Sequence, residues 1–409
     1  MIRHTLYIAV IIALTCIAAC TSVDTDTTPV GTTSKWVPAF NWNGVSTKPD
    51  SMLIIANRAI NTYRYVYSWN IDKGLGYLMA ESTDLGYKKT SIANDNDTTY
   101  NPTDTTETYA QQQAAGKAAE DNSRSDIELR PGEYTVMTAS MNPGIIYTCL
   151  NQTGFQQFMD STVSPREIAM YYKTLTADSV HSMFGKAWTD FNPAQKYIPD
   201  LGPLYFAEQK QLTIPTSMPT QFTLQDITQE LTIHFNVHLI GAHVSISDIV
   251  GDISGIASNV RMSSLYINTG ATRKMPFRAD MNLGADSTIS CTAKLTIPGI
   301  ISTVDTTTLT GTGVLQLAIY AETIDSDGKT VKKTYYVSKN VNEEIREGEY
   351  SKLGDDNVHL VIAEHDITLN ITTPIYIDRH TILTLPDNVS TLNRWIVDKE
   401  FEQQEDIEI

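Results

Sequence analysis

The sequence contains few cysteines, and their spacing is poor for cross-linking. Four cysteines occur in 409 residues. Cys16 and Cys20 stand near the start, so only Cys149 and Cys291, which are 142 residues apart, belong to the body of the protein. That spacing gives neither a disulfide framework nor a metal-binding motif. We expect two buried thiols, with a bridge between them as the alternative.

Positive charge is also scarce. The chain has 30 Lys and Arg residues against 47 Asp and Glu residues, for a formal net charge of -17. Nucleic acids select basic surfaces, so this balance argues against a nucleic-acid partner. It equally disfavours direct adsorption to anionic lipid headgroups. The acidic surface mainly serves solubility.

Long apolar runs are missing except at the very beginning. Residues 6–19 form an apolar run behind the basic Arg3. A run of about fourteen residues suits a signal peptide and is too short for the roughly 20 residues of a membrane-spanning helix. We therefore expect residues 1–19 to be an export signal, and any membrane attachment to depend on lipid.

The end of this signal predicts that lipid. Ile17, Ala18 and Ala19 stand directly before Cys20. Small residues let a peptidase approach the backbone, and the thiol accepts a diacylglyceryl group. We predict a bacterial lipoprotein that begins at lipidated Cys20; the alternative is an ordinary cleavage site beside a chance cysteine. The polar residues 20–35 are expected to be a flexible tether.

After the tether the chain shows short apolar and aromatic runs between turn residues, the signature of an all-β protein. Asp325 to Gly328 is expected to be a hairpin loop between two strands. A Ser164-Pro165 start signal predicts one helix or helical turn within 164–184. The expected strands cover 36–42, 52–56, 63–69, 133–139, 145–150, 204–214, 231–240, 262–267, 288–297, 309–324 and 330–338.

The clustered prolines and glycine at 199–203 suggest a domain boundary near residue 200. The length after removal of the signal suits two or three domains. We expect an N-terminal β-sandwich over 36–200 and a C-terminal β-sandwich over 201–409, the latter ending in an acidic strand.

Catalytic patterns are missing from the sequence, which predicts neither an enzyme nor a cofactor or metal. His234 and His238 would lie on one face of a strand about 13 Å apart, too far to share a metal ion. We expect them to be surface histidines. His359 and His365 are spaced more widely still. Asp325 begins a calcium-loop-like pattern that lacks its final acidic ligand, so we interpret it as a turn.

Aromatic residues support a rival interpretation. Twenty tyrosines and five tryptophans are enough for a sugar-stacking platform. The chain would then be a surface glycan-binding lipoprotein of a polysaccharide-uptake system. A coplanar trio of exposed aromatic rings would favour this alternative, although aromatic residues also populate strands generally.

Several motifs resemble those of one family. Beside the lipidation motif these are Phe40-Asn41-Trp42, Lys48-Pro49-Asp50, the strand at 129–136 (LRPGEYTV) and the segment 253–258 (ISGIAS). Together they resemble the fimbrillin-like lipoproteins of Bacteroides and Porphyromonas relatives, in particular the FimB/Mfa2 fimbrial-subunit group. The resemblance implies two tandem transthyretin-like β-sandwich domains with few short helices. It also implies lipidation at the outer membrane and a structural, anchor or adhesive role in a type V pilus. The implied partners are other fimbrial subunits and a host or glycan ligand.

The same resemblance implies assembly by strand exchange, in which a strand of one subunit fills a groove of the next. In shaft subunits an arginine- or lysine-directed protease first removes the N-terminal strand. Arg58 and Arg64 are the candidate processing sites, and solvent-facing arginines on a sheet are the alternative. An anchor subunit would keep its lipid and remain uncut. Residues 395–409 form either a donor strand or a terminal strand with an acidic end.

Overall fold

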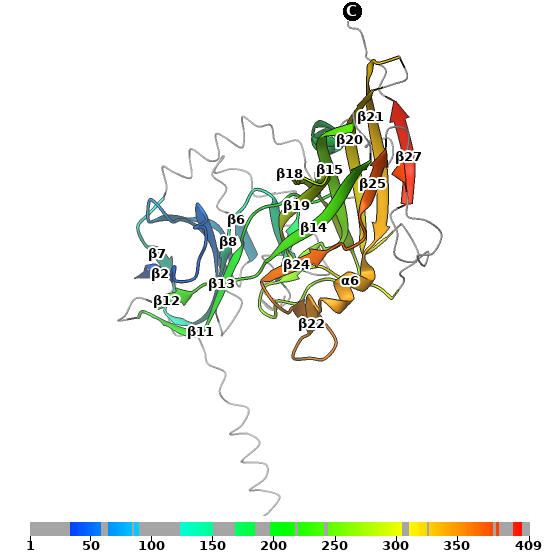
Figure 1. The fold of residues 1–409 in the computed structure, drawn as a ribbon. Coiled ribbons are helices and arrows are strands. Elements are labelled where there is room, and N and C mark those ends of the chain that lie inside the picture. The colour runs from blue at the N-terminus through cyan, green and yellow to red at the C-terminus, as the bar shows by residue number, and fades with distance from the viewer. Residues whose placement is uncertain are drawn as a thin grey trace, which may run out of the picture.

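The computed structural model has two lobes built almost entirely of β-strands (Figure 1). The all-β prediction with few short helices is confirmed, since the described residues contain 27 strands, numbered β1 to β27, and the helices α4 and α6. The described residues are 33–58, 64–83, 86–89, 123–149, 168–184, 197–216, 220–240, 244–304, 311–324, 327–378, 382–383 and 396–402.

The N-terminal lobe is centred on a seven-stranded sheet in the order β13-β11-β8-β3-β4-β5-β6. Its middle strands are apolar along their length because both faces of the sheet are covered. Met52 to Ala56 are all buried, and so are Arg64 to Trp69. The strands are β3 (Ser51–Arg58), β4 (Arg64–Asn70), β5 (Leu75–Thr83), β6 (Gly86–Lys89), β8 (Gly132–Ser140), β11 (Tyr205–Ile214) and β13 (Gln225–Asp226).

One face of that sheet is covered by two separate strand pairs. Strand β1 (Ser34–Trp36) pairs antiparallel with β7 (Ile127–Leu129), and β2 (Pro38–Asn41) pairs parallel with β12 (Thr220–Thr223). Trp36 and Phe222 meet edge to face between the pairs, with their ring centroids 6.0 Å apart. This contact joins the two pairs into one covering layer over an aromatic core.

The C-terminal lobe is a sandwich of two sheets. The strand order is β18-β19-β14-β25-β26 in one sheet, with β24 also paired to β14, and β17-β15-β20-β21-β27 in the other. The first sheet contains β14 (Gln229–Ile240), β18 (Asp280–Leu283), β19 (Thr288–Ile297), β24 (Asp366–Asn370), β25 (Ile375–Asp378) and β26 (Ile382–Leu383). The second contains β15 (Val244–Ala257), β17 (Thr272–Arg278), β20 (Val314–Ile324), β21 (Thr330–Asn340) and β27 (Ile396–Glu402).

The core of this sandwich includes side chains from strands in which buried and solvent-facing positions alternate. Along β14 and β19 every second side chain is buried, as expected for strands with one covered face. The buried side chains join a cluster that also contains Leu53, Ile55 and Met137 of the seven-stranded sheet. The two lobes therefore share one continuous apolar core.

Smaller sheets connect the lobes. Strand β10 (Ile168–Tyr172) lies between β9 (Ile145–Cys149) and β16 (Asn259–Arg261). Strand β22 (Ser351–Leu353) forms a hairpin with β23 (Leu360–Ile362), and the helices are α4 (Ala177–Phe184) and α6 (Asn342–Glu347). Strands on either side of residue 200 pair with one another, as β8 does with β11 and β10 with β16. The domain division near residue 200 stays a prediction, and it does not coincide with a break in strand pairing.

The structure confirms a helix within 164–184 and corrects two other local expectations. The helix is α4, which begins at Ala177, where the Thr176 hydroxyl accepts a bond from the Ser179 amide. The preceding residues 168–172 form strand β10, so the helix begins later than the Ser164-Pro165 signal predicts. In place of the expected strand at 262–267, residues 262–264 form a turn and Leu265 takes a positive φ of 57°. Ser34 and Lys35 belong to strand β1 and not to the tether.

Other expectations are confirmed or lie outside the described part. Strand β19 covers 288–297 as predicted, and β20 and β21 pair around the Asp325 to Gly328 loop. Residues 1–32, which include the expected signal peptide, Cys16 and Cys20, lie outside the described residues.

Candidate functional site

The C-terminal strand β27 closes one edge of the five-stranded sheet. It pairs antiparallel with β21, from Lys333 opposite Glu402 to Ser338 opposite Ile396. In Figure 1 it is the red arrow at the outer side of the C-terminal lobe. The ladder is irregular between Tyr336 and Val337, where one residue of β27 is left over. Such a bulge locally interrupts the ladder of hydrogen bonds.

The neighbouring strand β21 is well anchored in the lobe. It pairs over its full length with β20, from Val314 opposite Asn340 to Ile324 opposite Thr330. Tyr335, Tyr336 and Val337 are all buried. Loss of β27 would therefore leave β21 in place, with its outer backbone groups ready to receive a strand.

Both candidate processing sites are buried. Arg58 is 8% exposed and Arg64 is 0% exposed, on the neighbouring strands β3 and β4. The Arg58 guanidinium donates to the Pro131 carbonyl at 2.6 Å, and the Arg64 Nε donates to the Asn57 side chain at 3.1 Å. The alternative of solvent-facing arginines is wrong, because both faces of this sheet are covered.

Gly132 shows how closely the chain approaches Arg58. A Cβ atom at Gly132 would lie 2.5 Å from the Arg58 Nε. The Pro131-Gly132 segment at the start of β8 therefore packs directly against a buried arginine. Processing at Arg58 or Arg64 stays a prediction. A cut after Arg58 would release β3 from between β4 and β8, in the middle of the sheet.

The solvent face of the six-stranded sheet is polar. His234 Nδ1 lies 3.0 Å from the Thr292 hydroxyl, and His238 Nδ1 lies 2.8 Å from the Thr288 hydroxyl. Each pair joins directly opposite residues of β14 and β19. The prediction of surface histidines is confirmed, since both rings point away from the apolar core on alternate positions of β14.

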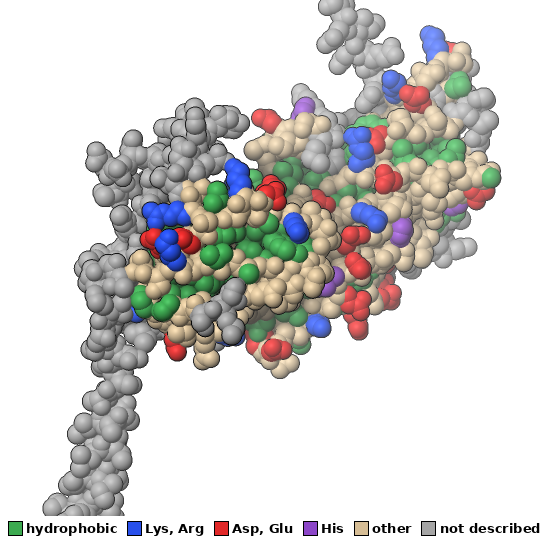
Figure 2. All heavy atoms as spheres, turned by 90° about the vertical axis from the view of Figure 1, so that its left-hand side faces the viewer, with side chains coloured by type: hydrophobic (Ala, Val, Ile, Leu, Met, Phe, Trp, Pro, Cys, Tyr) green, Lys and Arg blue, Asp and Glu red, His purple; other side chains and the backbone are tan. Residues whose placement is uncertain are grey.

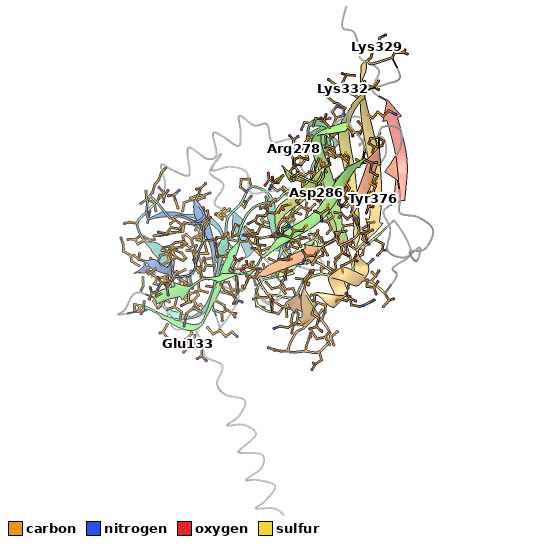
Figure 3. All side chains as sticks on the ribbon, viewed as in Figure 1. Glu133, Arg278, Asp286, Lys329, Lys332 and Tyr376 are labelled. Atoms are coloured by element: carbon orange, nitrogen blue, oxygen red, sulfur yellow. The ribbon has the colours of Figure 1, made fainter. Side chains whose placement is uncertain are left out.

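One aromatic ring lies on this polar face. Tyr376 stacks on His238, with centroids 5.1 Å apart and an interplanar angle of 19°. Figure 3 labels Tyr376 and Asp286 near the same end of the sheet. Bonds from the Thr288 hydroxyl and amide hold the pKa of the Asp286 carboxyl below its ordinary value, and the nearby His238 lowers it further. The Tyr376 ring thus contacts an imidazole group, which contacts the Thr288 hydroxyl, and the Thr288 amide donates to the Asp286 carboxylate. These groups can form hydrogen bonds with a polar ligand.

A second aromatic group lies in the N-terminal lobe. Phe40 stacks on Phe222 at 29° and contacts Trp42 at 41°, and Lys48 lies 5.4 Å from the Trp42 ring centre. Figure 2 shows hydrophobic side chains gathered on the face of this lobe. Phe222 is only 2% exposed, so these three rings are not the exposed coplanar trio that would favour glycan stacking.

A compact polar cluster occupies the tip of the β22–β23 hairpin. His359 Nδ1 lies 2.6 Å from Asp356 Oδ2 and the His359 ring stacks on Tyr266 at 4.9 Å. Asp356 also accepts bonds from the Val358 and His359 amides. The bonds from His359 hold the pKa of the Asp356 carboxyl well below its usual range. His365 lies elsewhere, with its Nδ1 2.8 Å from the Thr228 carbonyl oxygen.

Cys291 is a buried free thiol. Burial raises its pKa to about 12. The expectation of a buried thiol is confirmed for Cys291, whereas the side chain of Cys149 lies outside the described ones.

The described ranges contain no group of three or more His, Cys, Asp or Glu side chains placed to hold a metal ion. Within the same ranges, no helix has the length and apolar character needed to cross a bilayer.

Three solved structures of Bacteroidetes proteins are similar to this chain. A Bacteroides ovatus structure assigned as an adhesin is 12% identical with a TM-score of 0.38, covering 75% of this chain and 83% of its own. The fimbrial anchor protein Mfa2 from Porphyromonas gingivalis is 8% identical with a TM-score of 0.35, covering 91% and 97%. A Bacteroides thetaiotaomicron structure assigned to polysaccharide binding is 9% identical with a TM-score of 0.32, covering 91% and 99%. No family model and no curated protein matches the sequence.

Proposed function

We propose that this chain is a cell-surface lipoprotein that serves as a structural, anchor or adhesive subunit of fimbriae. Lipid on Cys20 holds it in the outer membrane, and its partners are other fimbrial subunits. Subunits join by strand exchange at the edge of the five-stranded sheet. The observation that carries the proposal is the position of β27 at the edge of the five-stranded sheet, where it pairs only with β21 among the described strands, through a ladder interrupted by a bulge.

This arrangement suits exchange for two reasons. The acceptor strand β21 is fixed independently of β27 by its full-length pairing with β20. An incoming strand of the same polarity would replace the same backbone bonds, so the exchange needs little net free energy. Adhesion and fimbrial anchoring are also the roles named for two of the solved structures above.

A reversible lock on β27 tests this proposal. Lys333 and Glu402 are directly opposite residues of β21 and β27. Opposite residues of antiparallel strands have the Cα separation that a disulfide needs. The double variant Lys333→Cys/Glu402→Cys should fail to enter fimbriae under oxidising conditions and recover when reduced, as measured by fimbrial co-purification and immunogold labelling.

The matched control places the disulfide between β20 and β21, two strands that stay paired when β27 is exchanged. Glu322 and Lys332 are opposite residues of β20 and β21. The variant Glu322→Cys/Lys332→Cys should assemble equally well oxidised and reduced. Assembly of the locked β27 variant would refute exchange of β27, and absence of the unmodified chain from fimbriae would refute the fimbrial role itself.

The polar sheet face supports a second candidate function, glycan binding. Tyr376 presents a ring beside His238, Thr288 and Asp286, which supply hydrogen-bonding groups. Sugar rings stack on aromatic side chains while their hydroxyls bond to such neighbours. If this face binds glycans, Tyr376→Ala should lower binding to a glycan array at least tenfold, whereas His359→Ala at the distant hairpin should not. Absence of array binding by the unmodified chain would exclude the candidate.

A further inference from the structure

A buried charged cluster lies on the outer face of the five-stranded sheet, under the segment that carries α4. Asp252 of β15 is 0% exposed and Lys274 of β17 is 6% exposed. Tyr197 forms a bridge with Lys274 and is held there by the Ile198 amide, which donates to the Lys274 carbonyl at 2.9 Å. The apolar cover around the cluster consists of Val180, Val250, Ala318 and Tyr336.

The lysine amine faces the carboxyl group of Asp252. Lys274 Nζ lies 3.2 Å from Asp252 Oδ1 and 3.5 Å from Oδ2. Despite the short distance, Oδ1 accepts no hydrogen bond. The amine therefore lies at nearly equal distances from the two oxygens of the carboxyl group and in direct contact with that group.

Two neighbours fix both groups in place. The Tyr197 hydroxyl donates a hydrogen bond of 2.7 Å to Asp252 Oδ2, which holds this carboxyl oxygen in position. Gln316 Oε1 accepts a hydrogen bond from Lys274 Nζ, and Gln316 Nε2 donates to the Ser338 hydroxyl at 3.2 Å. Gln316 stands directly opposite Asp252 on β20. The amine and the carboxyl group thus cannot turn away from one another.

We propose that Lys274 and Asp252 form an intramolecular amide cross-link between strands β17 and β15. Burial disfavours the ion pair, and it raises the pKa of the Asp252 carboxyl. Transfer of one proton from the ammonium to the carboxylate gives a neutral amine beside a neutral acid without any outside base.

The reaction balances within the pair. The Nζ lone pair attacks the Asp252 Cγ, and the Tyr197 hydroxyl stabilises the negative charge that develops on Oδ2. The Nζ–Cγ bond forms, one proton moves from Nζ to the leaving hydroxyl group, and the Cγ–O bond breaks to release one water. No oxidant, reductant or metal is needed. The product ties β17 covalently to β15, the strand with which it pairs in the sheet.

Peptide mapping of the full chain purified from cells tests this inference. Trypsin cuts after lysine and arginine, so Asp252 falls in the peptide 211–261, which contains no internal cut. An acylated Lys274 resists trypsin and stays in the peptide 274–278. The expected product is 211–261 joined to 274–278, lighter than their sum by one water, and tandem mass spectrometry should place the link at Asp252 and Lys274.

Two variants and one control complete the test. Asp252→Ala and Lys274→Arg should each release 211–261 as a separate peptide. Lys339→Met removes another buried lysine, 3.1 Å from Glu344, and should keep the cross-linked peptide. The peptide map of the unmodified chain tests the cross-link even if a variant fails to fold. Separate peptides 211–261 and 275–278 from folded, unmodified protein would show an ordinary buried ion pair and overturn the inference.

Discussion

At the scale of single residues, buried polar atoms in the C-terminal lobe find partners far away in sequence. The Asn342 side chain accepts a bond from the Thr303 amide and donates to the Thr312 carbonyl, both at 2.8 Å. Tyr197 reaches Asp252 across 55 residues. Burying a polar group without a hydrogen-bond partner costs free energy. The positions of these partners therefore determine how the loops pack on the sheets.

The Asn342 network gives a prediction for two glycines. Gly313 and Gly311 both have positive φ angles, 70° and 93°. A Cβ at Gly313 would lie 2.0 Å from the Asn342 Oδ1, whereas a Cβ at Gly311 meets nothing within 4 Å. In urea unfolding, Gly311→Ala should cost about 1 kcal/mol and Gly313→Ala about 3 kcal/mol. Equal losses would contradict the close packing of Asn342 on Gly313.

Cys291 gives a second prediction at this scale. Its thiol is buried and its pKa is raised to about 12 by that burial. Only the thiolate reacts with alkylating agents, so at about pH 8 the folded protein should leave Cys291 unlabelled by iodoacetamide. The urea-denatured protein should label it fully, as peptide mass spectrometry would show. Fast labelling in the folded state would mean that the strand β19 opens locally.

At the scale of elements, the hairpin β22–β23 depends on one exposed carboxylate. The Asp356 pKa lies below its ordinary value because the folded loop donates bonds to it. A group with a depressed folded pKa stabilises the fold fully above its unfolded pKa, and this contribution is lost as the pH falls through the folded pKa. The hairpin tip should therefore loosen under acid conditions.

Hydrogen exchange measures this loosening. In the unmodified protein, protection of the Val358 and His359 amides, corrected for intrinsic exchange, should decline as the pH falls below about 4. Asp356→Ala should lower that protection at neutral pH and remove its decline, whereas Asp355→Ala should preserve both. An unchanged profile in Asp356→Ala would show that the carboxylate does not order the loop.

At the scale of the whole molecule, the proposed attachment to the cell surface depends on the predicted lipid at Cys20. The predicted export signal at residues 1–19 and the small residues before Cys20 are the basis of that prediction. Cys20→Ala should abolish labelling by a radioactive or clickable fatty acid and release the protein from membrane fractions. Unchanged labelling would contradict the lipoprotein assignment.

Mapping the N-terminus of the mature protein distinguishes an anchor subunit from a polymerising subunit. A start at acylated Cys20 indicates an anchor-like subunit, and a start after Arg58 or Arg64 indicates a polymerising one. Since both arginines are buried in neighbouring strands, we expect the folded protein to resist cutting there.

The sequence by itself determined the features that depend on neighbouring residues. Alternation of apolar and polar residues located strands such as β14 and β19, and turn residues located the β20–β21 hairpin. Local patterns did not show where backbone partners would be found: residues 168–172, which follow the Ser164-Pro165 signal, form β10 because β9 and β16 supply backbone partners on both sides, and the predicted helix begins only at Ala177.

Only the tertiary structure decided which distant groups meet. Nothing in the spacing of Tyr197, Asp252, Lys274 and Gln316 indicates a cluster, because strand order and register bring them together. The burial of Arg58 and Arg64 likewise follows from layers packed on both faces of one sheet. Short stretches of sequence determine the positions of strands and turns. The burial of a residue and its contacts with distant residues are determined only when the sheets pack around a common core.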